Sequence, residues 1–108
     1  MKIATLNINS INARLSNLSR WLENNQPDVM LLQEIKTEFN NFPFFDLQVL
    51  GYDAKILGQK SYNGVAVLSK QKITVTAENL PEFPDENARY LETELTINGQ
   101  KYVVASLY

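Results

Sequence analysis

Residues 27–36, Pro-Asp-Val-Met-Leu-Leu-Gln-Glu-Ile-Lys, form the stretch of sequence that decides the fold. Residues 29–32 are an unbroken apolar run without the alternation of a half-buried strand, which predicts a strand buried on both faces. Gln33 and Glu34 follow at the point where this strand would leave the sheet. Ligands bind at that end of the strands in open α/β sheets, so Glu34 is the first candidate for chemistry.

The residues before this stretch predict another strand and a connecting helix. A strand is expected over residues 2–7, followed by turn residues in which Ser10 would cap the helix. Apolar residues at helical spacing continue toward Pro27, which cannot extend a helix; they are Ile11, Leu15, Leu18 and Leu22. Such a βαβ unit has parallel strands, so Asn7 and Glu34 should emerge at one edge of the sheet. Taken alone, an asparagine after a strand is usually a turn residue, and a glutamate there is usually a solvated charge. Because the two residues share an edge of the sheet, a functional role becomes as probable as these structural roles.

The rest of the chain predicts one short helix and several strands. The helix is expected from about residue 43, and strands are expected over residues 53–57, 65–69, 73–77 and 90–96. Asn98-Gly99 between two alternating runs is a hairpin signal, so residues 91–96 should pair antiparallel with residues 101–107. The last strand is apolar up to its final residue, whereas domains usually finish with frayed, polar residues. This pattern favours a domain truncated at its carboxyl end.

The composition describes an ordinary soluble globular protein and limits the chemistry open to it. The 108 residues are 44% hydrophobic and 20% charged, and a formal net charge of −2 gives no sign of nucleic acid, although an acidic protein can still carry a local basic patch. There is no cysteine and no histidine, which excludes disulfides, zinc–thiolate sites and histidine-assisted nucleophiles. Carboxylates, amides and phenols remain, and oxygen ligands suit a hard cation such as magnesium, manganese or calcium.

The sequence shows no targeting signal. No apolar stretch approaches the roughly 20 residues of a membrane span, and the amino terminus lacks the apolar core of a signal peptide. A cytoplasmic location without membrane attachment is therefore expected.

A series of short stretches, in their order and spacing, resembles the amino-terminal part of exonuclease III-type apurinic/apyrimidinic endonucleases, in the DNase I-like endonuclease/exonuclease/phosphatase superfamily. The stretches are residues 1–10, 26–29, 32–36, 51–52, 58–60, 62–69, 89 and 106–108. The pair Gln33-Glu34 is common to the superfamily, whereas Gly58-Gln59-Lys60 and the stretch from Tyr62 to Ala66 point to exonuclease III. Two positions depart from the pattern: Leu6 stands where an aromatic residue is usual, and Ile35 where threonine is common.

The resemblance implies a fold class and a domain organisation. The fold would be the first half of a four-layer DNase I-like α/β sandwich with a mixed β-sheet. Residues 1–108 would be the amino-terminal portion of a single endonuclease/exonuclease/phosphatase-type domain, truncated at the carboxyl end. We expect this half to supply essentially one sheet, with Val65, Val67 and Val103 partly facing water.

The resemblance also implies a DNA-repair phosphodiesterase, an abasic-site endonuclease with 3′-to-5′ exonuclease and 3′-end cleaning activity on double-stranded DNA. It implies a metal site, with Glu34 binding Mg²⁺, or Mn²⁺ in its place, and Asn7 ordering that site by hydrogen bonding or through water. Tyr108 falls on the family's active-site tyrosine. Tyr62 and Arg89 fall on positions that contact DNA phosphates, a role that suits a phenol and a guanidinium.

Relatives in that family are well over twice this length, and their remaining part carries a Gly-Asp-Phe-Asn stretch and a late Asp-His pair. The chain as given is therefore expected to be inactive alone and to self-associate, whereas the parent enzyme would be a monomer. Two alternatives stay open. One is a catalytically silent remnant or fragment, and the other is a superfamily phosphatase or phosphodiesterase with another substrate, against which the 62–69 stretch and Arg89 argue.

Overall fold

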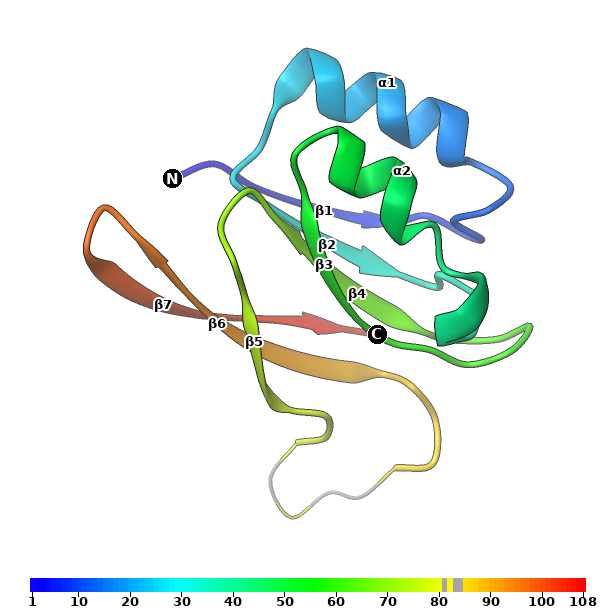
Figure 1. Cartoon of the computed structure of the whole chain (residues 1–108). Helices are drawn as coiled ribbons and strands as arrows, with labels where there is room; N and C mark the ends of the chain where they lie inside the picture. The colour runs from blue at the N-terminus through cyan, green and yellow to red at the C-terminus, as the bar shows by residue number, and fades with distance from the viewer. Residues whose placement is uncertain (81, 83–84) are drawn as a thin grey trace.

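Two β-sheets pack face to face, and both helices lie on the outer side of one of them (Figure 1). The computed structural model describes residues 1–80, 82 and 85–108. Sheet A has the strand order β1-β2-β4-β3 and sheet B the order β5-β6-β7. The strands are β1 (Ile3–Asn7), β2 (Val29–Gln33), β3 (Asp53–Leu57), β4 (Val65–Ser69), β5 (Thr74–Ala77), β6 (Tyr90–Ile97) and β7 (Gln100–Leu107). The helices are α1 (Leu15–Asn25) and α2 (Phe44–Val49), and a 3-10 helix, η1, spans Phe39–Asn41.

Sheet A is mixed, as expected from the sequence. β1 and β2 are parallel, with Ile3 opposite Val29, and they form the predicted βαβ unit with α1 between them. β4 runs antiparallel to both β2 and β3. Sheet B is antiparallel, and its β6–β7 hairpin turns at Asn98-Gly99 as predicted, with Ile97 opposite Gln100.

Strand β4 is buried along its whole length and divides the core in two. Ala66 and Leu68 belong to the cluster that includes the buried residues of α1 and α2. Val65 and Val67 face the opposite way and pack with Leu91 of sheet B. Because neighbouring residues of a strand point to opposite faces, this one strand packs against both the helices and sheet B.

The expectation that these residues supply essentially one sheet is wrong. Val65 and Val67 are fully buried, because β5, β6 and β7 form a separate sheet that covers the inner face of sheet A. Val103, by contrast, is 60% exposed, as expected. A strand pattern reveals which residues of a segment share a face, but it does not reveal the strand's partner, so the sequence alone did not separate the two sheets.

Helix α1 starts later than the sequence predicts. Asn9 and Ser10 have positive φ values (47° and 82°), and α1 starts at Leu15 with Arg14 at its N-cap position. The hydroxyl of Ser10 accepts 3.4 Å from the N–H of Ala13, so it caps the turn before the helix and not α1 itself. Ile11 is fully buried, but it lies in the turn before the helix. The chain leaves α1 at Gln26, whose N–H donates 2.9 Å to the carbonyl of Leu22. No helix in the described residues has the length and hydropathy to cross a membrane.

The two sheets have open edges on the same side of the sandwich. β7 contacts β2 and β4, whereas β6 contacts β4 and β3, so β7 lies toward the side that ends in β1. Both of these edge strands carry exposed apolar residues, namely Ile3, Leu6, Val103 and Leu107. The opposite edge strands are more polar, with Asp53 and Lys55 on β3 and two threonines on β5. Polar residues discourage strand addition, so the β1/β7 side is the better candidate for an interface.

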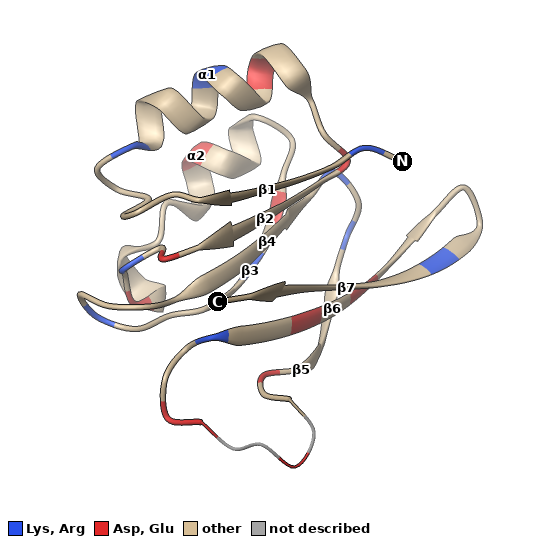
Figure 2. Ribbon diagram, turned by 180° about the vertical axis from the view of Figure 1, so that it is seen from behind, with Lys and Arg blue, Asp and Glu red and all other residues tan. Residues whose placement is uncertain are grey.

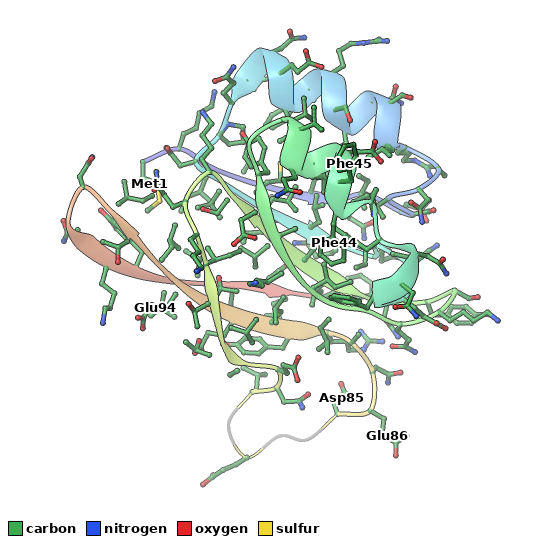
Figure 3. All side chains as sticks on the ribbon, viewed as in Figure 1. Met1, Phe44, Phe45, Asp85, Glu86 and Glu94 are labelled. Carbon is green, nitrogen blue, oxygen red and sulfur yellow. The ribbon has the colours of Figure 1, made fainter. Side chains whose placement is uncertain are left out.

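The outer face of sheet B is partly charged. Glu94 projects from this face (Figure 3), where it lies 3.4 Å from the ammonium of Lys101. Glu92 accepts hydrogen bonds from the hydroxyls of Thr76 (2.7 Å) and Tyr90 (2.9 Å). These contacts lower the pKa of Glu92, the bond from Thr76 most, and the bond to Glu92 raises the pKa of Tyr90.

Candidate active site

The ends of β1 and β2 bring Asn7 and Glu34 together. The two strands are parallel, with Asn7 opposite Gln33, and their arrows point to the same side of the molecule (Figure 1). Glu34 has a left-handed backbone conformation (φ 54°), which turns the chain out of the sheet. Asn7 Nδ2 donates a hydrogen bond of 2.6 Å to Glu34 Oε1. The expectation that these two side chains meet at one edge is therefore confirmed.

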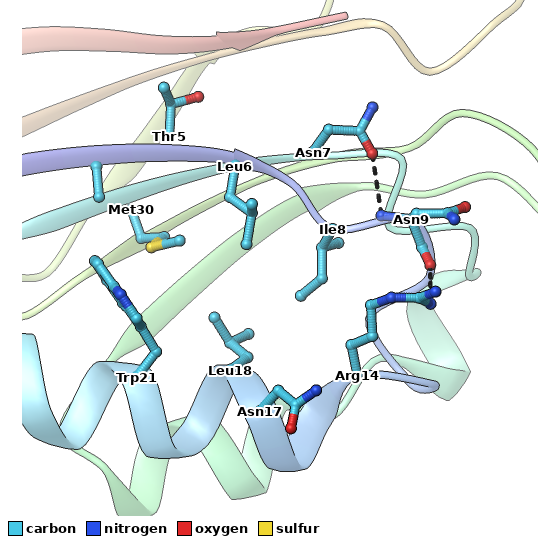
Figure 4. Close-up of a pocket in the computed structure, with 11 residues that line it drawn as sticks. Thr5, Leu6, Asn7, Ile8, Asn9, Arg14, Asn17, Leu18, Trp21 and Met30 are labelled. Carbon is cyan, nitrogen blue, oxygen red and sulfur yellow. Dashed lines mark hydrogen bonds between the residues drawn. The ribbon is translucent and has the colours of Figure 1, made fainter.

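The side-chain amide of Asn7 has a defined orientation. Its Oδ1 accepts a hydrogen bond of 3.1 Å from the backbone N–H of Asn9, marked by a dashed line in Figure 4. Only the oxygen of an amide accepts a hydrogen bond, so Nδ2 must face Glu34. Asn7 thus orders the carboxylate as a hydrogen-bond donor, and its role at a metal stays a prediction.

A cation approaches the other oxygen of the carboxylate. Lys36 Nζ lies 3.6 Å from Glu34 Oε2 and donates a bond of 2.6 Å to Asn9 Oδ1. The pKa of Glu34 is lowered, first by the hydrogen bond from Asn7 and then by Tyr108 and Lys36, against an opposing effect of burial. The carboxylate is therefore ionised throughout the neutral range.

Tyr108 reaches the same edge from sheet B. Its backbone N–H donates 2.8 Å to the carbonyl of Arg89, and the guanidinium of Arg89 lies 5.2 Å from the centre of the Tyr108 ring. The phenol interacts with the carboxylate of Glu34, and this interaction raises the pKa of Tyr108. The expectation that the Tyr108 hydroxyl lies at the edge occupied by Glu34 is confirmed, and the carboxyl end of the chain lies on that side in Figure 2.

Side-chain hydrogen bonds between the two sheets, which we call the polar tie, link Gln33 of sheet A to Ser106 of sheet B next to the site. Gln33 Nε2 donates bonds of 3.1 Å to Ser106 Oγ and to Thr5 Oγ1. Ser106, which is fully buried, donates 2.7 Å to the carbonyl of Leu32. Because Gln33 precedes Glu34 and Ser106 lies two residues before Tyr108, the tie sets the position of β7 against β2 next to the site.

The loop between β3 and β4 completes the edge and carries Tyr62. It is attached on both sides, since the carbonyl of Asn63 accepts 3.0 Å from Lys36 N–H and Gly64 N–H donates 2.9 Å to Ala88. Gly64 has a φ of 89°, and a Cβ there would stand 2.6 Å from Ile35 Cγ1, so only glycine fits. Tyr62 is 71% exposed on this loop, between the turn of Glu34 and the start of β6.

A groove of about 500 Å³ between β1 and α1 ends at the site (Figure 4). Its lining is apolar over most of its length, where it includes Leu6, Leu18, Trp21 and Met30. The polar end is formed by Asn7, Asn9, Asn17 and Arg14, whose guanidinium bonds the carbonyl of Asn9. An anionic substrate group fits the polar end and not the apolar part of the groove.

Residues 4–108 match the Endonuclease/Exonuclease/phosphatase family. The chain belongs to this family. It is 42% identical over 96 residues to exodeoxyribonuclease III of Haemophilus influenzae, an alignment that covers 88% of this chain and 36% of that protein. These findings confirm the resemblance read from the sequence.

Solved structures support the same assignment. An AP endonuclease from Archaeoglobus fulgidus superposes with a TM-score of 0.84 at 35% identity, over 95% of this chain and 39% of that one. A 3′ phosphatase from Neisseria, bound to a product DNA hairpin, superposes with a TM-score of 0.74 at 34% identity, over 95% of this chain and 40% of that one. The chain thus has the DNase I-like α/β fold and spans well under half the length of these relatives.

The oxygen donors of this family member fit a hard divalent cation. Magnesium keeps several of its waters and uses one or two carboxylates together with substrate phosphates. Glu34 supplies one ionised carboxylate that an amide orders and that water can reach, with 22% of its side chain exposed. In the described residues no group of three or more acidic, histidine or cysteine side chains gathers. The arrangement suits a weakly held, largely hydrated ion.

The sequence did not identify Asn9 and Lys36 as members of the site. A signal was present, because Asn7-x-Asn9 and Glu34-x-Lys36 repeat the same spacing at the ends of two paired parallel strands. The second residue of each pair, Asn9 or Lys36, has a left-handed backbone conformation. Its side chain therefore turns back toward the first residue of the pair, Asn7 or Glu34. Asparagine adopts this conformation more readily than most residues, but lysine does not suggest it.

Replacing Glu34 by glutamine should lower the pKa of Tyr108 in the metal-free protein. The neighbouring negative charge disfavours the phenolate, so its removal makes deprotonation easier. The pKa values are measured by NMR on ring-labelled tyrosine in the presence of EDTA. Tyr90 is the internal control, because Glu92 raises its pKa and this contact is unchanged. An unchanged titration of Tyr108 would contradict the contact with Glu34.

Proposed function

We propose that this chain forms the amino-terminal portion of the active site of a DNA-repair phosphodiesterase. Its substrates would be double-stranded DNA with abasic sites and with nucleotides or blocking groups at 3′ ends. The observation that carries the proposal is the convergence of Asn7, Glu34 and Tyr108 at one edge of the sandwich. The relatives support it by name, as an exodeoxyribonuclease III, an AP endonuclease and a 3′ phosphatase.

The proposed metal ligand is Glu34, which would hold magnesium, or manganese in its place, with Asn7 ordering the carboxylate. When bound, the cation supplies neutralisation of charge on the scissile phosphate and on the leaving 3′ oxygen. The lowered pKa of Glu34 supports this assignment, because the carboxylate needs no deprotonation at neutral pH. Asn7 donates to one carboxylate oxygen and so leaves the lone pairs of the other toward solvent and Lys36.

Tyr108 is proposed to act as a hydrogen-bond donor that orients the attacking group or the phosphate. Its raised pKa supports a donor role, because the phenol keeps its proton at neutral pH. Arg89 stacks on the Tyr108 ring and brings a guanidinium to the same edge, where it can pair with a DNA phosphate. Tyr62 is exposed on the adjoining loop, and we propose that it contacts the backbone of the duplex.

The remaining groups of the active site are proposed to come from the part of the domain that the relatives possess outside the matched region. The alignment covers 36% of the Haemophilus influenzae protein. Hydrolysis needs a positioned water and further stabilisation of the phosphate, and each of these accounts for a large share of the rate. The resemblance assigns those roles to a Gly-Asp-Phe-Asn stretch and an Asp-His pair.

A chimera tests the proposed function. All 108 residues of this chain replace the matching segment of the Haemophilus influenzae relative, so that Asn7, Glu34 and Tyr108 are all present. We expect magnesium-dependent cleavage of a duplex that contains one abasic site, and removal of a 3′-phosphate, both abolished by EDTA. A chimera that unfolds cooperatively but cleaves neither substrate would contradict the proposal. Hydrolysis of another phosphoester without cleavage of DNA would point to the phosphatase alternative.

A further inference from the structure

Four residues at the ends of β1 and β2 form a closed ring of polar contacts, namely Asn7, Asn9, Glu34 and Lys36. The N–H of Asn9 donates 3.1 Å to Asn7 Oδ1, and Asn7 Nδ2 donates 2.6 Å to Glu34 Oε1. Lys36 Nζ lies 3.6 Å from Glu34 Oε2 and donates 2.6 Å to Asn9 Oδ1. Each carboxylate oxygen therefore has its own partner, an amide on one side and an ammonium on the other.

The backbone is shaped to make this ring. Asn9, Glu34 and Lys36 all adopt left-handed conformations, with φ values of 47°, 54° and 53°. Such conformations are unfavourable for glutamate and lysine, and less so for asparagine, and they persist where neighbouring contacts support them. Ser10 N–H donates 2.8 Å to the carbonyl of Glu34, and Lys36 N–H donates 3.0 Å to Asn63. The backbone of Lys36 is thus held in an orientation from which its side chain reaches both Glu34 and Asn9.

We propose that Lys36 is a positioning residue that serves as a built-in counter-ion of Glu34. It holds the carboxylate in place in the metal-free protein and gives up Glu34 Oε2 when a divalent cation binds. This inference rests on the proposed metal-binding role of Glu34. The ammonium and the cation compete for one oxygen, and their positive charges repel over a few ångströms.

Asn9 Oδ1 can remain the hydrogen-bond acceptor of the Lys36 ammonium after the ammonium leaves Glu34. The bond from Lys36 Nζ to Asn9 Oδ1, at 2.6 Å, is shorter than the 3.6 Å separation from Glu34 Oε2. A small movement away from the carboxylate can therefore keep the bond to Asn9. The lysine and glutamate side chains are 29% and 22% exposed, so water enters as they separate and salt screens the repulsion.

Replacing Lys36 by methionine should raise the affinity of the chain for Mn²⁺ about tenfold at low ionic strength. Methionine fills the space of the aliphatic stem and removes the charge, and a unit charge acting on a divalent ion at this range changes affinity by about that factor. The gain should shrink at about 1 M salt, where the Debye length is about 3 Å. Lys36→Arg keeps the charge and should bind Mn²⁺ as the wild type does.

Affinity is read from Mn²⁺ titrations that follow the paramagnetic broadening of the backbone amide signals of residues 34 and 35. Lys70→Met is the matched control, because it removes the same charge at the opposite end of sheet A, after the β4 residue that pairs with Val29. Lys36→Gln replaces Lys36→Met if the methionine variant does not unfold cooperatively. This readout requires no enzymatic activity.

The outcomes separate this inference from the proposed function. Broadening that Glu34→Gln abolishes, with equal affinities in the wild type and in Lys36→Met, would overturn the role of Lys36 and leave the metal site standing. A gain in affinity that Lys70→Met reproduces would also overturn it. Absence of broadening at residues 34 and 35 in both the wild type and Lys36→Met at millimolar Mn²⁺ would refute the metal site itself, and the inference with it.

Discussion

Replacing Glu34 by glutamine in the chimera should lower kcat for abasic-site cleavage on the order of 10³-fold without unfolding the protein. Loss of charge stabilisation at a reacting phosphate removes several powers of ten from the rate. Glutamine is nearly isosteric and still offers an oxygen to Asn7 Nδ2, so the local structure can persist. What disappears is the negative charge that a divalent cation needs.

Rates under single-turnover conditions, together with thermal unfolding curves, measure this effect. Glu92→Gln is the control, because Glu92 is also a hydrogen-bonded carboxylate of lowered pKa but lies on sheet B, away from the site. The control should cleave at the rate of the unmodified chimera. The metal-ligand assignment fails if Glu34→Gln keeps the rate within about tenfold of the parent at saturating magnesium.

The same substitution should leave binding to DNA largely intact. Phosphate contacts of arginine, lysine and tyrosine supply most of the affinity for a duplex, and Glu34 supplies none of them. In the absence of magnesium, removal of a negative charge even favours an approaching phosphate. The defect should therefore fall on kcat and not on KM, as measured with the abasic duplex.

The location of Asn7 and Glu34 could be predicted from the sequence because it depends on few steps. Two apolar runs joined by a helix make parallel strands, and the residues that follow parallel strands share an edge. Position was therefore accessible without knowing any side-chain contact. Tyr108 and Arg89 flank strands of the other sheet, and their approach to Glu34 was predicted only from the resemblance to the family.

The second sheet and the polar ring around Glu34 were not accessible in this way. Which strands pair depends on contacts between distant segments of the chain. The apolar sequence of β4 is equally consistent with packing against helices and with packing against another sheet. The ring depends on left-handed conformations at Asn9 and Lys36. Asparagine adopts this conformation more readily than most residues, but lysine adopts it only where the surrounding structure supports it. Both failures concern non-local packing, which no window of sequence contains.

Mixing the 108-residue chain with the carboxyl-terminal part of the Haemophilus influenzae relative should produce abasic-site cleavage that neither component shows alone. The β1/β7 side offers two open strand edges with exposed apolar side chains, which is the kind of surface that added strands complete. The same surface should make the isolated chain self-associate or aggregate. Cleavage of the abasic duplex and light scattering measure the two effects.

The site of assembly can be tested in the same mixture. Ile3→Lys, on the open edge strand β1, should weaken complementation, because a charge opposes strand addition there. Val75→Lys, on the opposite edge strand β5, changes a residue of similar exposure (37% against 47%) and should complement as the unmodified chain does. Equal effects of the two substitutions would move the interface away from the β1/β7 side. Robust magnesium-dependent cleavage by the purified 108-residue chain, lost in Glu34→Gln, would show that the chain needs no partner and that its described residues already contain the groups which hydrolyse the phosphate.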